Sequence, residues 1–437
     1  MQSTNPSTPT GRPAFSAGEY LKRLRLFRPN ARLYLLSLAI GGVSFGIYSL
    51  LLNFYILSLG FDEALIGGML TISNVVTLAG AIPAGALADR LGRKPSLVWA
   101  TLLSSLAVAG LVFLRTPIAF YLMSALLGIG QTLGAVTSGP FLMENSGEAD
   151  RTYLFSFSAA IQMMASVLGN WLGGRMPAWL GMAEGVPATS ASAYGWSLAI
   201  VVGISAVGML PLLLLKRQRT ARQAGEPTLT PFQYAKRHPA LLVKLISPML
   251  ITSLGAGLLI PFMNLFFRRA YAQTDASIGT LFASGSLAMG IGLLLAPPLA
   301  ERWGKIRLVV ISQALSIPFL ALLGFAPWFW LSAFGYLARL ALMNMSGPIY
   351  QAYVMEQVGR EARATVASLV SMSWSFGWAF SPTISGWLQV RYGFDPIYVG
   401  TITTYVLAIF LTWHFFWPRP TPSISGPLAG KRVSLPD

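Results

Sequence analysis

The sequence predicts an all-α integral membrane protein with twelve transmembrane helices, arranged as two pseudo-symmetric six-helix bundles. Of its 437 residues, 54% are hydrophobic and only 11% are charged, whereas soluble proteins carry about 25% charged residues. Twelve apolar runs are long enough to cross a bilayer, which takes about 20 residues. Short segments of the first half also recur in the second half at one constant offset along the chain, which pairs Leu65 with Ser277 and Asp89 with Glu301. A soluble chain of this composition lacks the polar groups to cover its surface.

The apolar runs divide evenly between the two halves of the chain. They carry Gly and Pro freely, which membrane helices tolerate because neighbouring groups satisfy the backbone. The first six predicted spans are Leu33–Leu57, Leu65–Leu87, Ser96–Leu114, Ile118–Leu142, Thr152–Gly173 and Tyr194–Leu215. The second six are Leu241–Phe267, Ser277–Ala300, Leu308–Gly324, Trp328–Ala352, Thr365–Leu388 and Ile397–Trp417.

The basic residues predict how these spans are oriented. If both chain ends lie on one side of the membrane, that side holds 25 of the 31 Lys and Arg residues and the other side holds five. Loops rich in Lys and Arg stay in the cytoplasm. We therefore expect a multi-pass protein of the cell membrane (plasma or inner membrane) with both termini cytoplasmic. Its basic loops would contact anionic lipid headgroups at the cytoplasmic face.

The same division predicts the domain organisation. A cytoplasmic tail (1–32) precedes the N-terminal bundle (33–215). A polar, basic cytoplasmic linker (216–240) connects it to the C-terminal bundle (241–417), and a second cytoplasmic tail (418–437) follows.

The composition excludes several kinds of site. The chain has no Cys and only two His, so disulfides, thiolate metal sites and His-rich metal sites are excluded. It has no Gly-rich nucleotide loop and no paired carboxylates at membrane depth. We expect no enzyme activity, no cofactor, and no catalytic or metal-binding residue. A net charge of +16 would suggest nucleic acid in a soluble protein, but these cations lie between apolar runs, so we expect no nucleic-acid partner.

Three matches at one offset indicate that each half is a copy of one six-helix unit. Both copies begin on the same side of the membrane, so they are parallel repeats, and such halves hold a substrate site between them near the midplane. The segments that recur at this repeat offset are "LIGGML" (Leu65–Leu70) as "SIGTLF" (Ser277–Phe282), Asp89–Gly92 as Glu301–Gly304, and "MENSGEADR" (Met143–Arg151) as "MEQVGREAR" (Met355–Arg363).

A charged loop follows the second span. "GALADRLGRKPSL" (Gly85–Leu97) contains a Gly, a hydrophobic residue two positions on, an Asp, a basic residue, a second Gly and a basic pair. This pattern resembles the signature loop of the major facilitator superfamily, and the twelve-span repeat agrees with it. The resemblance covers the chain from about Leu33 to Trp417 and implies solute transport by alternating access. The matching residues are Gly85, Leu87, Asp89, Arg90, Gly92, Arg93 and Lys94.

The second copy, "PPLAERWGKIRLV" (Pro297–Val309), keeps less of this pattern. We expect Gly92 to take a positive φ in the turn. The resemblance implies that Glu144 pairs with Arg93 or Lys94, and that Glu356 pairs with Lys305. We interpret these groups as a conformational latch that forms only when the cytoplasmic ends of the bundles are close and so favours the outward-open state. The alternative is that they only fix topology. The predicted latch residues are Gly85, Asp89, Arg90, Gly92, Arg93, Lys94, Glu144, Arg151, Glu301, Arg302, Gly304, Lys305, Glu356 and Arg363.

One basic residue, Arg339, lies near the centre of a predicted span. A central Arg costs about 2.5–3.5 kcal/mol on insertion and usually faces a cavity. "SGP" (Ser138–Pro140) recurs as Ser346–Pro348, at an offset slightly shorter than that of the other matches. This predicts a small length difference within these spans and makes Gln131 the counterpart of Arg339. We expect the two to face each other across a central cavity, with Arg339 contacting an anionic or polar substrate group. The alternative is that Arg339 bonds helix carbonyls and a neighbouring Asn or Ser, and locks the bundle.

Other polar and aromatic residues inside the spans complete the predicted substrate site. Asn53 and Asn264 end matching stretches of the first and seventh spans. All fifteen carboxylates fall outside the spans, so Glu144, Glu356 or Asp62 would carry protons if protons are the coupling ion. The predicted substrate-binding residues are Arg339, Gln131, Asn53, Asn264, Gln162, Asn344, Tyr48 and Trp374.

These features predict a monomeric secondary transporter that moves a small organic molecule by rocker-switch alternating access. The expected cavity is apolar and aromatic, which favours efflux of an amphipathic or lipophilic compound. By resemblance, proton-driven drug exporters have an Arg where this chain has Ser124, which argues against drug:proton exchange. The alternatives are uptake or facilitated diffusion of a polar or anionic solute, lipid flipping, and a non-transporting membrane sensor.

Overall fold

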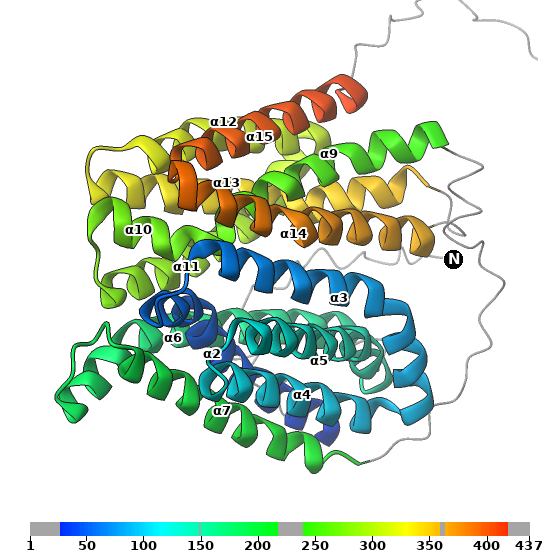
Figure 1. Ribbon diagram of the computed structural model, residues 1–437. Helices are drawn as coiled ribbons and strands as arrows, with labels where there is room; N and C mark the ends of the chain where they lie inside the picture. The colour runs from blue at the N-terminus through cyan, green and yellow to red at the C-terminus, as the bar shows by residue number, and fades with distance from the viewer. Residues whose placement is uncertain (1–26, 148–149, 217–238, 359–362, 418–437) are drawn as a thin grey trace, which may run out of the picture.

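The computed structural model describes residues 27–147, 150–216, 239–358 and 363–417. These residues form helices and no strand, and the helices lie in two bundles, one above the other in Figure 1. Most of the two predicted tails and of the predicted linker lies outside the described ranges.

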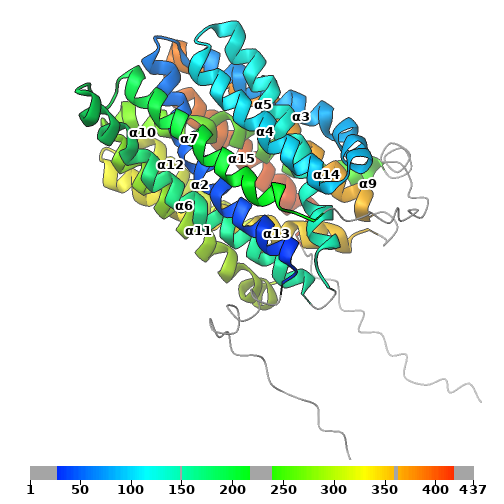
Figure 2. The same cartoon turned by 90° about the horizontal axis from the view of Figure 1, so that it is seen from below.

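The N-terminal bundle contains six long helices. Helix α7 contacts α2 on one side and α4 on the other, as Figure 2 shows from below. Three of the helices begin at a side-chain cap, from Asp62, Thr116 or Ser190, that accepts a backbone N–H. The helices are α2 (Pro29–Ser58), α3 (Glu63–Leu91), α4 (Arg93–Phe113), α5 (Pro117–Glu144), α6 (Arg151–Glu184) and α7 (Ala191–Leu213).

The C-terminal bundle repeats this arrangement, but its first span is bent. The bend is a 3₁₀ turn, η1, that contains Pro261, a residue that has no N–H and interrupts the α-helical ladder. The elements are α9 (Pro239–Leu259), η1 (Ile260–Phe262), α10 (Met263–Tyr271), α11 (Asp275–Trp303), α12 (Lys305–Phe325), α13 (Phe329–Glu356), α14 (Arg363–Tyr392) and α15 (Asp395–Phe416).

Each of the twelve predicted spans overlaps a helix or, in the seventh, the α9–η1–α10 unit. Nine of the described spans are long and apolar enough to cross a membrane by composition alone. The other three, α6, α13 and α14, are 34, 28 and 30 residues long. All three run alongside the apolar helices, and they carry more polar residues, among them Arg339 and Gln162.

The two halves match each other more closely than the sequence predicted. Helices α5 and α13 both have 28 residues, and both their first and their last residues are related by the repeat offset. The predicted length difference within these spans is therefore wrong, because the "SGP" motif has moved by about one helical turn inside helices of equal length. At the repeat offset the counterpart of Arg339 is Leu127, not Gln131.

The turns of the two charged loops match as well. Gly92 has φ 88° and Gly304 has φ 87°, and each ends one long helix and precedes the next. Only Gly adopts this left-handed conformation without strain. The predicted positive φ of Gly92 is confirmed.

The two bundles are joined at one end and separate at the other. Buried apolar residues of both bundles, such as Phe54 and Phe266, form one continuous core at the end that carries Glu63 and Asp275. At the end that carries the charged loops, the N-terminal and C-terminal bundles have separate cores. We call these the closed end and the charged-loop end.

Close backbone contact between helices joins the bundles at the closed end. A Cβ at Gly67 of α3 would overlap the Pro382 carbonyl oxygen of α14. A Cβ at Gly279 of α11 would overlap the Asn170 carbonyl oxygen of α6. Gly67 and Gly279 are related by the repeat offset. The α3–α14 and α6–α11 crossings therefore both depend on a Gly at the same position of the repeat.

Candidate functional site

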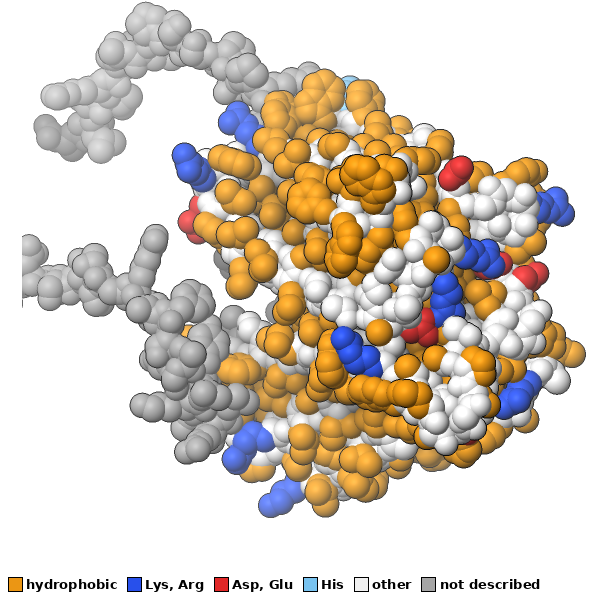
Figure 3. Space-filling model, turned by 90° about the vertical axis from the view of Figure 1, so that its left-hand side faces the viewer, with side chains coloured by type: hydrophobic (Ala, Val, Ile, Leu, Met, Phe, Trp, Pro, Cys, Tyr) orange, Lys and Arg blue, Asp and Glu red, His pale blue; other side chains and the backbone are white. Residues whose placement is uncertain are grey.

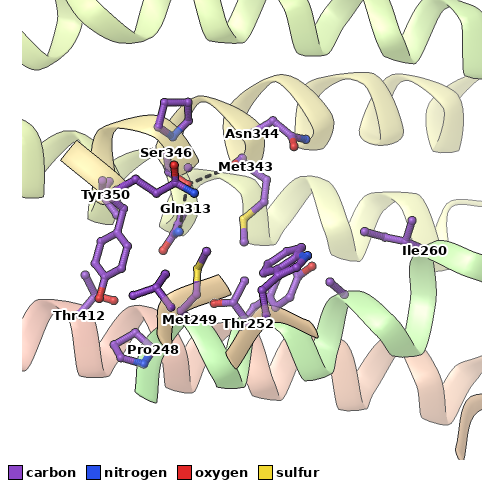
Figure 4. Close-up of a pocket in the computed structure, with 18 of the residues that line it drawn as sticks. Pro248, Met249, Thr252, Ile260, Gln313, Met343, Asn344, Ser346, Tyr350 and Thr412 are labelled. Atoms are coloured by element: carbon purple, nitrogen blue, oxygen red, sulfur yellow. Dashed lines mark hydrogen bonds between the residues drawn. The ribbon is translucent and has the colours of Figure 1, made fainter. Parts of the chain in front are cut away.

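A cavity of about 530 Å³ lies inside the C-terminal bundle. All of its lining residues come from that bundle and most from α9, α13 and α14. In Figure 4, Tyr350 and Thr412 lie at one end of this cavity and Ile260 lies at the other. The predicted substrate site lay between the two halves; the cavity instead belongs to one of them.

Arg339 of α13 lines this cavity and is 2% exposed. Its Nη2 donates to the Tyr405 hydroxyl at 2.9 Å, and the guanidinium carbon lies 5.6 Å from the centre of the Tyr405 ring. Its Nε has no hydrogen-bond partner, and none of the ion pairs among the described residues includes Arg339. A buried cation without a counter-ion is costly, so this position favours an anionic ligand.

The rest of the cavity combines apolar walls with a few polar groups. Trp374 and Met343 supply aromatic and thioether surface, the mixture that holds flat apolar ligands. Gln313 of α12 donates to the Ser346 hydroxyl at 3.0 Å, the dashed line in Figure 4. Asn344 lies one helical turn from Leu340 and donates to its carbonyl at 2.9 Å. Of the predicted substrate-binding residues, the cavity brings together Arg339, Asn344 and Trp374.

Asn53 and Asn264 lie elsewhere, at the closed end. The Asn53 Nδ2 donates to the Asn264 Oδ1 at 2.9 Å and to the Pro261 carbonyl at 2.7 Å. The Asn264 Nδ2 donates to the Leu50 carbonyl at 2.8 Å. Both side chains are buried, and they join the bundles rather than line the cavity.

The remaining predicted substrate-binding residues belong to the N-terminal bundle. Gln131 of α5 and Gln162 of α6 are exposed. Tyr48 of α2 is half-buried and packs against the shared core. None of the three lines the cavity.

The closed end holds a polar cluster that sequence reasoning missed. The Arg268 guanidinium of α10 pairs with Asp275, lies 3.4 Å from the centre of the Phe54 ring, and donates to the Tyr194 hydroxyl at 2.7 Å. The Tyr194 hydroxyl in turn donates to the Asp275 Oδ2 at 2.7 Å. In Figure 3 acidic and basic side chains gather on this face, among hydrophobic side chains.

A second ion pair crosses between the bundles at the same end. Arg269 of α10 pairs with Glu63, the first residue of α3, whose side chain is 4% exposed. Glu63 and Asp275 are related by the repeat offset, and each begins a helix, where a carboxylate is favoured by the helix dipole. That equivalence, together with two adjacent Arg residues on the cation-poor side, was the signal in the sequence.

The charged loops form ion pairs within single bundles. Arg93 contacts Asp89 at 2.8 Å and Glu144 at 2.9 Å, and Lys305 pairs with Glu356. Each pair joins helices of one bundle and is present although the cores at this end are separate. The prediction that these pairs form only when the bundles approach each other is therefore wrong. Both members of each ion pair belong to the same bundle, so the pair does not require contact between bundles.

The other predicted latch residues have varied surroundings. Lys94 donates to the Leu213 carbonyl at the end of α7, at 2.6 Å. The Arg151 side chain is half-buried, and its Nε has no hydrogen-bond partner among the described residues. The Arg363 side chain lies outside the described part of the chain, Gly85 lies in the last part of α3, and Arg90, Glu301 and Arg302 are exposed.

The three carboxylates named for proton coupling all have structural partners. Glu144 and Glu356 hold the cations of the charged loops. Asp62 caps α3, its Oδ1 accepting the Leu65 N–H at 3.0 Å. Among the described residues, the carboxylates that are buried are Glu63 and Asp275.

The chain is similar to several transport proteins. It is 23% identical to the multidrug resistance protein MdtG of Dickeya zeae (strain Ech586) over 393 residues, which are 85% of this chain and 90% of that protein. It is 30% identical to a gallate transporter of Pseudomonas putida over 156 residues, 36% of this chain and 31% of that protein. It is 27% identical to a cis,cis-muconate transport protein of Acinetobacter baylyi (strain ATCC 33305 / BD413 / ADP1) over 170 residues, 38% of this chain and 40% of that protein.

Solved structures share the fold. The nucleoside transporter NupG superposes with a TM-score of 0.73 at 17% identity, covering 90% of this chain and all of NupG. A bacterial homologue of the lysosomal transporter Spinster, in an inward-facing and unoccupied conformation, superposes with a TM-score of 0.65 at 14% identity, covering 91% of this chain and 95% of that one. The sequence model of the Major Facilitator Superfamily matches residues 33–257 and 245–435. The chain therefore belongs to the major facilitator superfamily and is a transporter of small solutes.

Proposed function

We propose that this protein is a secondary transporter of a small organic anion, whose carboxylate is held by Arg339. The observation that carries the proposal is the burial of the Arg339 guanidinium in a cavity, with a free Nε and without a carboxylate partner among the described residues. An Arg is suited to a carboxylate because its planar N–H groups match the two oxygens. The apolar walls around it would accommodate the body of the molecule.

Two relatives support an anionic substrate. The names of these two relatives give gallate and cis,cis-muconate as their substrates. Both compounds are carboxylates. Each similarity covers about two fifths of this chain or less, so the argument rests on the site and not on the relatives.

Transport would require the closed end to open. The basic loops favour a cytoplasmic charged-loop end, so the present conformation corresponds to one that is closed toward the outside. Release of the Arg269–Glu63 pair, the Tyr194–Asp275 hydrogen bond and the Asn53–Asn264 pair would open the outer side. The charged loops would then hold the ends of the helices within each bundle, rather than join the bundles.

The proposal is tested by counterflow in proteoliposomes. Vesicles loaded with unlabelled 4-hydroxybenzoate at pH 8 should accumulate the labelled compound, and protein-free vesicles should not. Arg339→Gln removes the charge-assisted hydrogen bond, which is worth about 1.5–3 kcal/mol, so it should slow counterflow at low concentration at least tenfold. Arg339→Lys keeps the charge and should retain part of the activity. Normal counterflow in Arg339→Gln would refute the role of Arg339.

Efflux of lipophilic compounds is the second candidate. The similarity to the multidrug resistance protein over most of both chains favours it. If it is correct, a neutral lipophilic dye would be transported equally well by the wild type and by Arg339→Gln, and 4-hydroxybenzoate would not compete with it.

A further inference from the structure

Arg339 keeps its positive charge in every conformation of the protein. An Arg side chain cannot lose its proton inside a protein, so burial cannot neutralise it in the way that burial neutralises a Lys or a His. The guanidinium is 2% exposed and donates to the neutral Tyr405 hydroxyl. A hydroxyl orients the guanidinium but does not balance its charge.

The carboxylates of the described residues lie too far away to balance this charge. Each of them lies within two residues of a helix end, whereas Arg339 is the eleventh of the 28 residues of α13. At 1.5 Å per residue, Arg339 is about 15 Å from one end of that helix and about 26 Å from the other. An ion pair requires a separation of about 4 Å. A rotation of the bundles moves helix ends toward or away from each other, but it does not bring a helix end to the middle of α13.

The missing counter-ion matters most when the protein changes sides. Alternating access passes through a state in which neither end of the protein is open. Bulk water then no longer reaches the cavity, and a buried cation without a partner is costly. A bound carboxylate removes this cost, because it pairs with Arg339. The occupied protein therefore passes through the closed state more easily than the empty protein.

From this we infer that the protein is an obligate exchanger, which carries one organic anion inward for each organic anion that it carries outward. This inference rests on the proposed function and adds the partner of the transported anion, a second anion of the same chemical class. A transporter that returned empty would bury the Arg339 charge without a counter-ion in every cycle.

The experiment measures efflux from proteoliposomes that are loaded with labelled 4-hydroxybenzoate at pH 8. Both sides contain the same concentration of KCl, and valinomycin prevents a membrane potential from opposing net movement of the anion. Efflux into medium with unlabelled 4-hydroxybenzoate should be at least about tenfold faster than efflux into medium without it, equivalent to about 1.4 kcal/mol in the barrier. Protein-free vesicles give the leak, which is subtracted.

A second measurement follows the opening of the empty protein. Because the chain has no Cys, a single Leu265→Cys substitution in the core at the closed end reports the opening of that end through its rate of labelling by a maleimide. In the otherwise wild-type protein, 4-hydroxybenzoate should accelerate this labelling by a similar factor, because the anion allows the bundles to pass through the closed state.

Two variants test whether the charge of Arg339 is the cause. Arg339→Gln removes the charge, so its reporter should be labelled rapidly with or without the anion. Met343→Glu places a carboxylate in the cavity one helical turn from Arg339, where it supplies a counter-ion, and should have the same effect. Arg307→Gln is the matched control, because Arg307 is an exposed Arg of the same bundle outside the cavity. It should keep the dependence on the anion.

The outcomes separate the two proposals. Equal efflux into the two media overturns the exchange and leaves the organic-anion function standing. Chloride that balanced Arg339 would give this result, because the protein could then return without an organic anion. If neither medium gives protein-dependent efflux, the organic-anion function fails together with the exchange. If Arg339→Gln and Met343→Glu still need the anion for rapid labelling, the inference from the Arg339 charge is overturned. The wild-type efflux comparison gives its answer even where a variant does not fold.

Discussion

Asn53 and Asn264 occupy equivalent places in the two halves, and each donates to the other's half of the molecule. The Asn53 amide donates to the Pro261 carbonyl and the Asn264 amide donates to the Leu50 carbonyl, and both acceptors lie three residues before the Asn of their own half. A third hydrogen bond joins the two side chains at 2.9 Å. The pair therefore joins the two halves reciprocally at the closed end, and opening that end leaves both amides without these partners.

Removing one member of this pair should favour opening. Asn53→Leu removes the donor to the Asn264 Oδ1 and to the Pro261 carbonyl. The Asn264 Oδ1 keeps the Leu265 N–H, but the Pro261 carbonyl loses its side-chain donor, a loss of about 1–3 kcal/mol. Because the chain has no Cys, Leu265→Cys in the shared core, 1% exposed, gives a single reporter. A maleimide should label this reporter faster in Asn53→Leu than in the wild type. Unchanged labelling would show that the pair does not hold the closed end.

Exchanging the charges of Glu63 and Arg269 tests the ion pair between the bundles. Arg269→Glu places two carboxylates together where one is 4% exposed, so we expect the reporter to be labelled about tenfold faster, equivalent to about 1.4 kcal/mol. Adding Glu63→Arg restores an attractive pair and should return labelling toward the wild-type rate. If the double variant behaves like the sum of the two single variants, the residues do not interact.

A side chain at Gly67 should prevent closure. Gly67→Val would force the added carbons into the Pro382 carbonyl, so the closed end should stay open and counterflow should fall sharply. Gly139→Val is the control, because among the described residues no atom outside its chain neighbours and the nearby backbone of its own helix lies within 4 Å of the Cβ position there. The steric account fails if both variants transport equally well.

Tyr405 should position Arg339 for its anion. Tyr405→Phe removes the hydroxyl that accepts from the Arg339 Nη2. We expect binding of 4-hydroxybenzoate by calorimetry to weaken about 3- to 10-fold, the value of one hydrogen bond. Unchanged binding would show that Tyr405 does not position Arg339.

The ion pairs of the charged loops should stabilise single bundles. The Arg93 side chain is 15% exposed and holds two carboxylates, whereas Lys305 and Glu356 are 37% and 54% exposed. Arg93→Ala should therefore lower the thermal midpoint more than Lys305→Ala, whose pair is worth about 0–1 kcal/mol. Neither variant should change labelling of the Leu265→Cys reporter. A large change would revive a latch between the bundles.

The sequence was sufficient for the parts of the fold that depend on local composition. Apolar length located the spans, and the constant repeat offset identified Gly92 and Gly304 as equivalent turns. The "SGP" motif led to a wrong alignment of α5 with α13. Membrane helices tolerate Pro at either of two positions one turn apart, so the motif does not mark equivalent residues. Only the equal helix lengths show that Leu127, and not Gln131, corresponds to Arg339.

The site was harder to predict, because a polar residue inside a span has two common uses. Arg339 and Asn344 line a cavity, while Asn53 and Asn264 join helices, and side-chain identity does not separate these roles. Glu63 and Asp275 were missed because the apolar runs begin two residues after them. Their burial arises from the docking of the other bundle, a contact between distant parts of the chain.

The location of the cavity within one bundle has a consequence for the transport cycle. Every lining residue belongs to the C-terminal half. A rigid rotation of the halves would therefore move the bound molecule together with the C-terminal bundle and leave its contacts intact. Substrate that enters from either side of the membrane would then contact the same cavity residues. The intrinsic affinities for inward- and outward-facing protein should be nearly equal, which leaves the direction of net flux to the gradients and not to the site.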